Sequence, residues 1–108
     1  MAEEASAREP AGVLGDLEAV LRDRRHDPPP GSYSATLLAD PERAARKIME
    51  ESFELCLELA RRDEHGAVTD RRRVVEEAAD VLFHVLAGVV GADVALDDVL
   101  DELEARRR

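Results

Sequence analysis

Residues 71–91 read RRRVVEEAADVLFHVLAGVVG, and this stretch decides the fold class. Its apolar residues recur at the spacing of an α-helix and cover about two-thirds of the circumference, which is typical of a helix buried on most sides. A narrow polar stripe runs along it, because Glu77, Asp80 and His84 follow one another at intervals of three and four residues. Carboxylates on a buried helix are unfavourable unless they are paired or bind a metal ion.

A second amphipathic helix precedes this one. Asp40 is a suitable N-cap and Pro41 suits the first turn, so the sequence predicts a helix to about Arg62. Its charged residues fall within roughly 100° of a helical wheel; they are Lys47, Glu50, Glu51, Glu54 and Glu58. The apolar residues occupy the other side, where Cys56 is expected to pack in the core. Taken alone, the pattern also fits an ordinary helix with a solvated acidic face.

The N-terminal third of the chain adds one more helix. Apolar residues at helical spacing predict it from Val13 to about Arg25, before three prolines and a glycine that cannot continue a helix. Residues 32–39 show no clear pattern beyond a single helical turn.

A short helix is expected at the C-terminal end. Asp97 is predicted to cap it. Its inner face is predicted to consist of Val99, Leu100 and Leu103. The sequence therefore predicts an all-α fold of four helices without a sheet, with a flexible N-terminus over residues 1–11 and a single helical domain over residues 12–108.

Charge and composition restrict the partners. The 108 residues have a formal net charge of -10, which argues against nucleic acid and against a membrane surface, because both need a basic face. A single cysteine excludes a disulfide within the chain. No apolar stretch approaches the roughly 18 residues of a membrane span, and the N-terminus lacks the apolar core of a signal peptide. We therefore expect a cytoplasmic protein.

Two acidic stripes on neighbouring helices are explained if they face each other across a cation. Clustered carboxylates repel, and hard divalent ions with oxygen ligands relieve that repulsion, so Mg²⁺, or Mn²⁺ as a substitute, is the natural choice. Because Mg²⁺ completes its shell with substrate phosphates, the predicted substrate is a polyphosphate ester. One Cys and three His give no zinc ligand set, and no Gly-rich phosphate loop is present.

The motifs Lys47-x-x-Glu50-Glu51-x-x-Glu54 and Glu77-x-x-Asp80 resemble the metal signature of the all-α MazG-like nucleotide pyrophosphatases. The segments PPPGSYSATLLA, KIMEESFE and EEAADVLFHVL resemble, more narrowly, the phosphoribosyl-ATP pyrophosphatase family of histidine biosynthesis, and the likeness covers about residues 14–107. The resemblance implies Mg²⁺-dependent hydrolysis of phosphoribosyl-ATP to phosphoribosyl-AMP and pyrophosphate. It also implies a homodimer in which helices of both chains complete the core.

On this reading the carboxylates hold one or two Mg²⁺ ions and serve catalysis; they are Glu50, Glu51, Glu54, Glu77 and Asp80. The substrate-binding candidates are Arg24, Ser32, Tyr33, Lys47 and His84. Each has an ordinary alternative, such as loop packing for Tyr33, an ion pair with Glu51 for Lys47, and a core position for His84.

Two other functions remain open at this level. A house-cleaning nucleoside triphosphate pyrophosphatase of the same fold would share the metal site and differ in the base and sugar pocket. A non-catalytic acidic helical module would bind a partner, and its carboxylates would have no reason to converge.

Overall fold

The computed structural model describes residues 10–107, and these residues form α-helices with no strand. The helices are α2 (Pro10–His26), α3 (Tyr33–Ala39), α4 (Pro41–Ala60), α5 (Arg71–Gly91) and α6 (Leu96–Arg106). The all-α prediction is confirmed. Helix α3 was not predicted as a helix, because the sequence indicated at most a single helical turn there. Most of the expected flexible N-terminus lies outside the described residues, although Pro10 and Ala11 belong to α2.

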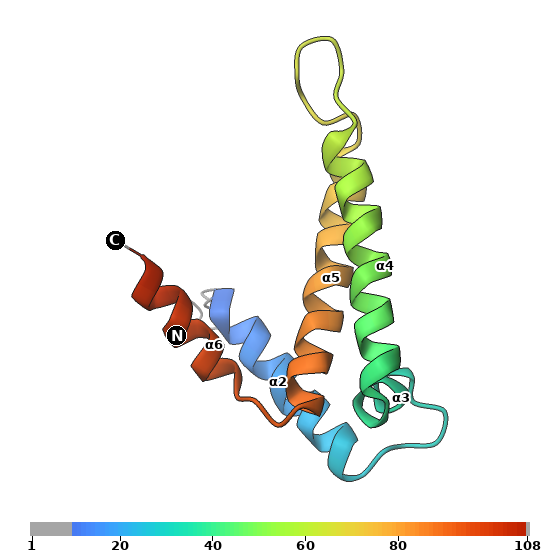
Figure 1. Ribbon diagram of the computed structural model, residues 1–108, viewed down its shortest axis with the longest axis vertical. Helices are drawn as coiled ribbons and strands as arrows, with labels where there is room; N and C mark the ends of the chain where they lie inside the picture. Colours follow the sequence, from blue (N-terminus) through green and yellow to red (C-terminus); the bar gives the residue numbers. More distant parts are fainter. Residues whose placement is uncertain (1–9, 108) are drawn as a thin grey trace, which may run out of the picture.

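The antiparallel pair of α4 and α5 forms the long axis of the molecule, with the loop between them at its far end (Figure 1). Both helices begin where the sequence predicts. The side chain of Asp40 accepts a hydrogen bond from the Arg43 N–H, and Asp70 accepts one from the Arg73 N–H, each at 3.1 Å. Such caps satisfy donors that an α-helix leaves unpaired in its first turn.

Helix α3 is held against the beginning of α4 and the end of α5. Ser32 caps it by accepting from the Ala35 N–H at 3.2 Å, and Asp40 closes it by donating its backbone N–H to the Leu37 carbonyl. Asp40 therefore ends α3 and starts α4. Gly91 allows the close approach of α5, because a Cβ there would lie 3.3 Å from the carbonyl oxygen of Leu38.

The core lies at the end of the helix pair where α2, α3 and α6 gather (Figure 1). Its buried residues come from α2, α3, α5 and α6; they are Leu21, Leu37, Leu38, Leu86, Ala87, Val90 and Leu96. The core therefore joins α2, α3 and α6 to one end of α5, and the rest of the α4–α5 pair lies outside it.

Helix α6 departs from its prediction. It begins at Leu96, so the predicted cap Asp97 lies inside its first turn, and Ala95 at the N-cap makes no side-chain hydrogen bond. The cap comes instead from α2, because the Leu96 N–H donates to Oε2 of Glu18 at 2.8 Å. Of the predicted inner face, Leu100 packs on the core, whereas Val99 and Leu103 are exposed.

Helices α4 and α5 share an exposed apolar face, which we define by Met49, Phe53, Cys56, Leu82 and Val85. The prediction that Cys56 packs in the core is wrong for this chain, as is the prediction that α5 is buried on most sides. The exposure of Cys56 follows from the orientation of α4. The acidic side of α4 faces α5, so the apolar side of α4 faces away from the fold.

Among residues 10–107, no single helix is long and apolar enough to span a membrane, and α5 with α6 meets that criterion only as a pair bent by 117°.

Candidate active site

Three carboxylates from α4 and α5 meet in one cluster. Ligand atoms of Glu51, Glu77 and Asp80 all lie within 4.8 Å of one another, which is close enough to hold one metal ion. Glu51 and Glu77 are buried, and Asp80 is exposed. The two acidic stripes inferred from the sequence therefore face each other, as the cation hypothesis requires.

Glu77 is the most constrained member of this acidic cluster. Its Oε2 forms an ion pair with Arg73 at 3.1 Å, whereas its buried Oε1 has no hydrogen-bond partner within residues 10–107. Burial and then the negative charge of Glu54 raise its pKa, and Arg73 opposes them. A buried acceptor without a partner beside like charges is the arrangement that a bound cation relieves.

The other two predicted ligands lie at the edge of the cluster. Glu54 is exposed but close enough to Glu77 for its negative charge to raise the pKa of Glu77. Glu50 turns toward Lys47, whose Nζ lies 3.1 Å from its Oε1 and 3.5 Å from Oε2 of Glu51. The hydrogen bond to Glu50 is the main reason that the pKa of Lys47 is raised. Lys47 thus stays a cation next to the cluster.

Tyr33 and His84 connect this cluster to the loop that precedes α3. The Tyr33 hydroxyl lies 2.8 Å from Nε2 of His84, and Nδ1 of His84 lies 2.7 Å from the Asp80 carbonyl oxygen. Because a carbonyl only accepts, Nδ1 carries the proton in neutral His84, and the tyrosine hydroxyl donates to Nε2. His84 is buried, so this pairing fixes its ring.

A cavity of about 410 Å³ opens between the end of α2 and the start of α3, and Arg24, Ser32 and Tyr33 line it with Phe83. Arg24 donates to the hydroxyl of Ser34 at 3.4 Å, and Ser32 shares a 3.1 Å hydrogen bond with the same hydroxyl. The five candidates for substrate binding therefore form two groups. Arg24, Ser32 and Tyr33 line this cavity, whereas Lys47 and His84 lie next to the carboxylates. Tyr33 connects the two groups through its hydrogen bond to His84.

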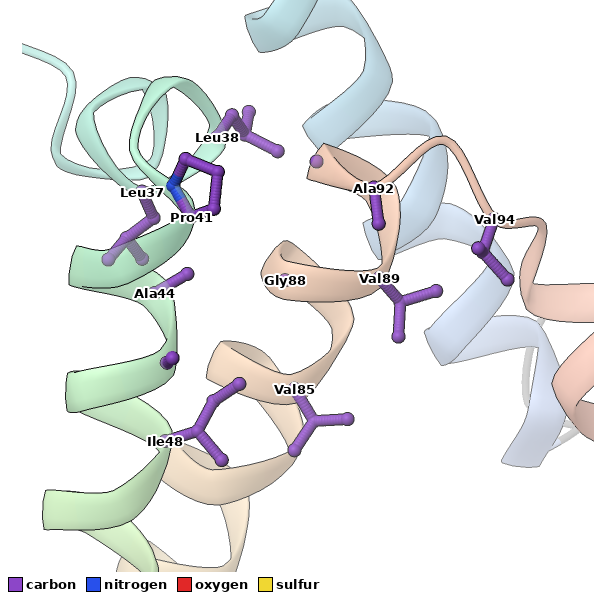
Figure 2. Close-up of a pocket in the computed structure, with 12 residues that line it drawn as sticks. Leu37, Leu38, Pro41, Ala44, Ile48, Val85, Gly88, Val89, Ala92 and Val94 are labelled. Atoms are coloured by element: carbon purple, nitrogen blue, oxygen red, sulfur yellow. The ribbon is translucent and has the colours of Figure 1, made fainter.

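A second cavity, of about 380 Å³, is almost wholly apolar (Figure 2). Figure 2 shows Leu37, Leu38 and Ile48 on one side of it and Val85 and Val89 of α5 on the other. No ionisable side chain of the described residues lines it, so it offers no ligand for a cation, and Val85 belongs both to it and to the apolar face of α4 and α5.

Sequence reasoning missed one residue beside the acidic cluster and one in the lining of the cavity between α2 and α3. Arg73 pairs with Glu77, and the only sequence signal was its position four residues earlier on the same helix face. Ser34 is buried between Arg24 and Ser32, and nothing in the spacing of the loop indicated it.

An all-helical chain in which two antiparallel helices gather their carboxylates is the arrangement of the MazG-like pyrophosphatases. A model of the family described as phosphoribosyl-ATP pyrophosphohydrolase matches residues 14–107, and the chain belongs to this family.

The similar proteins bear related names. A phosphoribosyl-ATP pyrophosphatase of Ruegeria pomeroyi is 42% identical over 96 residues, covering 88% of this chain and 85% of that protein. The one of Dinoroseobacter shibae is 42% identical over 95 residues, covering 87% and 86%. A histidine biosynthesis bifunctional protein of Schizosaccharomyces pombe is 36% identical over 98 residues, which are 91% of this chain but 21% of that protein.

Proposed function

We propose that the protein hydrolyses phosphoribosyl-ATP to phosphoribosyl-AMP and pyrophosphate, the second step of histidine biosynthesis. Family membership and the names of the relatives support the substrate. The observation that supports the chemistry is the convergence of Glu51, Glu77 and Asp80, which hydrogen bonds of His84 connect to Tyr33 in the lining of the cavity.

The carboxylates fit a hard divalent cation, and we propose Mg²⁺, with Mn²⁺ as a substitute. Glu51, Glu77 and Asp80 would hold it, and Glu54 would complete the set from the edge of the cluster. The buried, unpaired Oε1 of Glu77 supports this fit. When bound, the ion withdraws charge from the phosphates and lowers the pKa of a water molecule. Glu50 would not bind the ion in this proposal, because its carboxylate forms an ion pair with Lys47 and holds that side chain in place.

The remaining polar residues bind and orient the substrate in this proposal. Lys47 is a point charge for phosphate oxygens at the border of the cluster. Arg24, with five donors in a planar fork, lines the cavity where the rest of the nucleotide would lie. Tyr33 is positioned between the two and is fixed by His84.

A homodimer completes the fold in this proposal. Met49 and Leu82 are 66% and 55% exposed, and contiguous exposed apolar patches mark interfaces. Ala45 and Ile48 of α4 line one cavity together with Val85 and Val89 of α5, so apolar residues of the two helices meet on a common side there. A second copy that presents the same side would build a four-helix bundle with two-fold symmetry. The cytoplasmic location stays a prediction.

The test of activity is pyrophosphate release from phosphoribosyl-ATP, with Mg²⁺ and with a chelator, beside dCTP, dUTP and the four ribonucleoside triphosphates. We expect Mg²⁺-dependent release from phosphoribosyl-ATP and little from the others. Preference for a free triphosphate would assign the chain to house-cleaning, and the absence of release from every substrate would contradict an enzymatic role.

The test of the dimer is sedimentation equilibrium of Leu82→Lys beside Leu103→Lys. Both leucines are more than half exposed, but Leu103 lies on α6, outside the α4–α5 apolar face. Placing a charge in an interface removes roughly 1.5–3 kcal/mol of apolar burial and adds the cost of burying the ammonium group. We expect Leu82→Lys to dissociate the dimer and Leu103→Lys to leave it intact. The reverse result would move the interface to α6.

A further inference from the structure

Arg73 joins two buried carboxylates that belong to different helices. Its Nη2 lies 3.1 Å from Oε2 of Glu77 on α5, and its Nε lies 3.7 Å from Oε2 of Glu58 on α4. Glu58 also accepts from Nη1 of Arg61 at 2.9 Å. The side chains of Glu58 and Glu77 are 6% and 8% exposed, whereas that of Arg73 is 49% exposed. The side chain of Arg73 therefore extends from solvent, and its guanidinium lies between two carboxylates that are shielded from solvent.

This arrangement differs from an ordinary ion pair on a helix surface. Exposed pairs four residues apart contribute only about 0.3–0.5 kcal/mol, because water screens them. Arg72 and Glu76 make such a pair one residue earlier, with side chains 77% and 46% exposed. A buried carboxylate is different, because loss of its partner leaves a charge without compensation.

Arg73 contacts only one of the two carboxylate oxygens of Glu77. Arg73 occupies Oε2 and leaves Oε1 buried without a hydrogen-bond partner in the part of the chain that the structure describes. Glu77 contributes an oxygen to the group with Glu51 and Asp80, whereas Glu58 is not part of that group. Glu58 is thus a buried acid that the acidic cluster does not use, and its partners are Arg61 and Arg73.

We propose that Arg73 is a positioning residue that fixes the carboxylate of Glu77 for metal binding, and that Glu58 holds Arg73 in place for this purpose. This inference rests on the metal site of the proposed function. Hydrogen bonds from outside the ligand shell orient a coordinating carboxylate, and their loss typically lowers metal affinity by about 10- to 100-fold. The planar fork of arginine suits a bridge between two carboxylates better than lysine does.

A purely electrostatic role makes the opposite prediction. Arg73 is a cation beside a cation site, so its removal would strengthen metal binding if charge alone mattered. The sign of the change in affinity therefore separates positioning from charge balance.

The experiment is calorimetric titration of the metal-free protein with Mn²⁺, comparing the wild type with Arg73→Gln and with Arg72→Gln. Both substitutions remove one charge from the first turn of α5, and the cap bond uses the backbone N–H of residue 73, which glutamine keeps. We expect Arg73→Gln to bind Mn²⁺ about 10- to 100-fold more weakly and Arg72→Gln to bind as the wild type does. Circular dichroism and thermal unfolding in a chelator check that both variants are folded.

The outcomes separate the two proposals. Mn²⁺ binding by Arg73→Gln that equals or exceeds wild-type affinity overturns the positioning role and leaves the metal site standing. A wild type that binds no Mn²⁺ overturns the metal site itself.

Glu58→Gln tests the outer part of the bridge. It is expected to weaken Mn²⁺ binding in the wild type and to have no further effect in Arg73→Gln, because Glu58 acts through Arg73. An equal effect in both backgrounds would mean that Glu58 acts by its charge alone and would overturn its role as a holder of Arg73.

Discussion

The hydroxyl of Tyr33 donates a hydrogen bond of 2.8 Å to Nε2 of His84, and this bond ties the segment after the proline loop to the polar stripe of α5. The opposite ring nitrogen of His84 donates to the carbonyl of Asp80. A residue that lines the substrate cavity and a residue of the acidic cluster are therefore two hydrogen bonds apart.

Replacing Tyr33 by Phe removes the hydroxyl and keeps the ring. Because the buried Nε2 of His84 then lacks its donor, we expect the free energy of unfolding to fall by about 1 kcal/mol, measured by chemical denaturation. KM for phosphoribosyl-ATP should rise more than kcat falls, since the tyrosine is fixed at the cavity rather than at the carboxylates. Nitrogen chemical shifts of His84 in the wild type should show the proton on Nδ1, and a proton on Nε2 would contradict the assignment of donors.

Replacing Glu77 by Gln removes a charge that the fold holds unfavourably. The raised pKa means that the folded protein ionises this carboxyl less readily than the unfolded chain does, so its charge lowers stability at pH above the folded pKa. In a chelator at pH 7 we expect Glu77→Gln to melt at a higher temperature than the wild type. Mg²⁺ should stabilise the wild type more than the variant, and activity should fall by at least about 100-fold.

Glu76→Gln is the matched control for Glu77→Gln. Glu76 is exposed and pairs with Arg72 outside the acidic cluster, so activity and Mg²⁺ stabilisation should match the wild type. Equal losses from the two substitutions would mean that the net charge of the helix, not the position of Glu77, determines activity.

Glu18 gives the fold a pH dependence of its own. Its pKa is lowered mainly by the N–H of Leu96, and Arg22 adds a smaller effect, so its ionised form stabilises the folded state. That contribution is present above the unfolded pKa of about 4.3 and is lost as pH falls through the folded value. Glu18→Gln should therefore unfold about 1 kcal/mol more easily at pH 7. The difference from the wild type should shrink in denaturation curves below about pH 4, and a constant difference would exclude the charge as its cause.

Two glycines in helices should respond oppositely to substitution. A Cβ at Gly15 meets no atom within 4 Å, so Gly15→Ala should stabilise α2 by about 0.5–1 kcal/mol. A side chain at Gly91 meets the backbone of Leu38, and Gly91→Val should cost about 1–3 kcal/mol by separating α3 from α5. Thermal unfolding distinguishes the two, and stabilisation by Gly91→Val would contradict the close packing.

The starts of α4 and α5 were predictable from local signals, whereas the start of α3 at its local cap Ser32 was not. Asp40 and Asp70 start α4 and α5 as predicted, because an N-cap acts within its own turn. Asp97 failed because the beginning of α6 is satisfied by Glu18, which is 78 residues away in the sequence. Local rules do not detect a cap that another helix supplies.

The faces of α4 and α5 were predictable, but not what covers each of them. The spacing of Glu51, Glu77 and Asp80 predicted two acidic stripes, and the structure brings the three residues together. The same wheel placed Cys56 on an apolar side, which was read as the core, and that side is exposed in a single chain. Periodicity identifies an apolar face without saying whether the same chain or another molecule buries it.

The segment between α4 and α5 offers a place to rearrange the chain order. Apart from Val68, residues 61–70 are exposed, and they lie at the end of the helix pair opposite α2, α3 and α6 (Figure 1). Exposed loop tips of this kind tolerate new termini. A circular permutant opened at Gly66 would keep the acidic cluster, the cavity and the core on the same helices, and would turn the covalent hairpin of α4 and α5 into a non-covalent pairing of two ends of one chain.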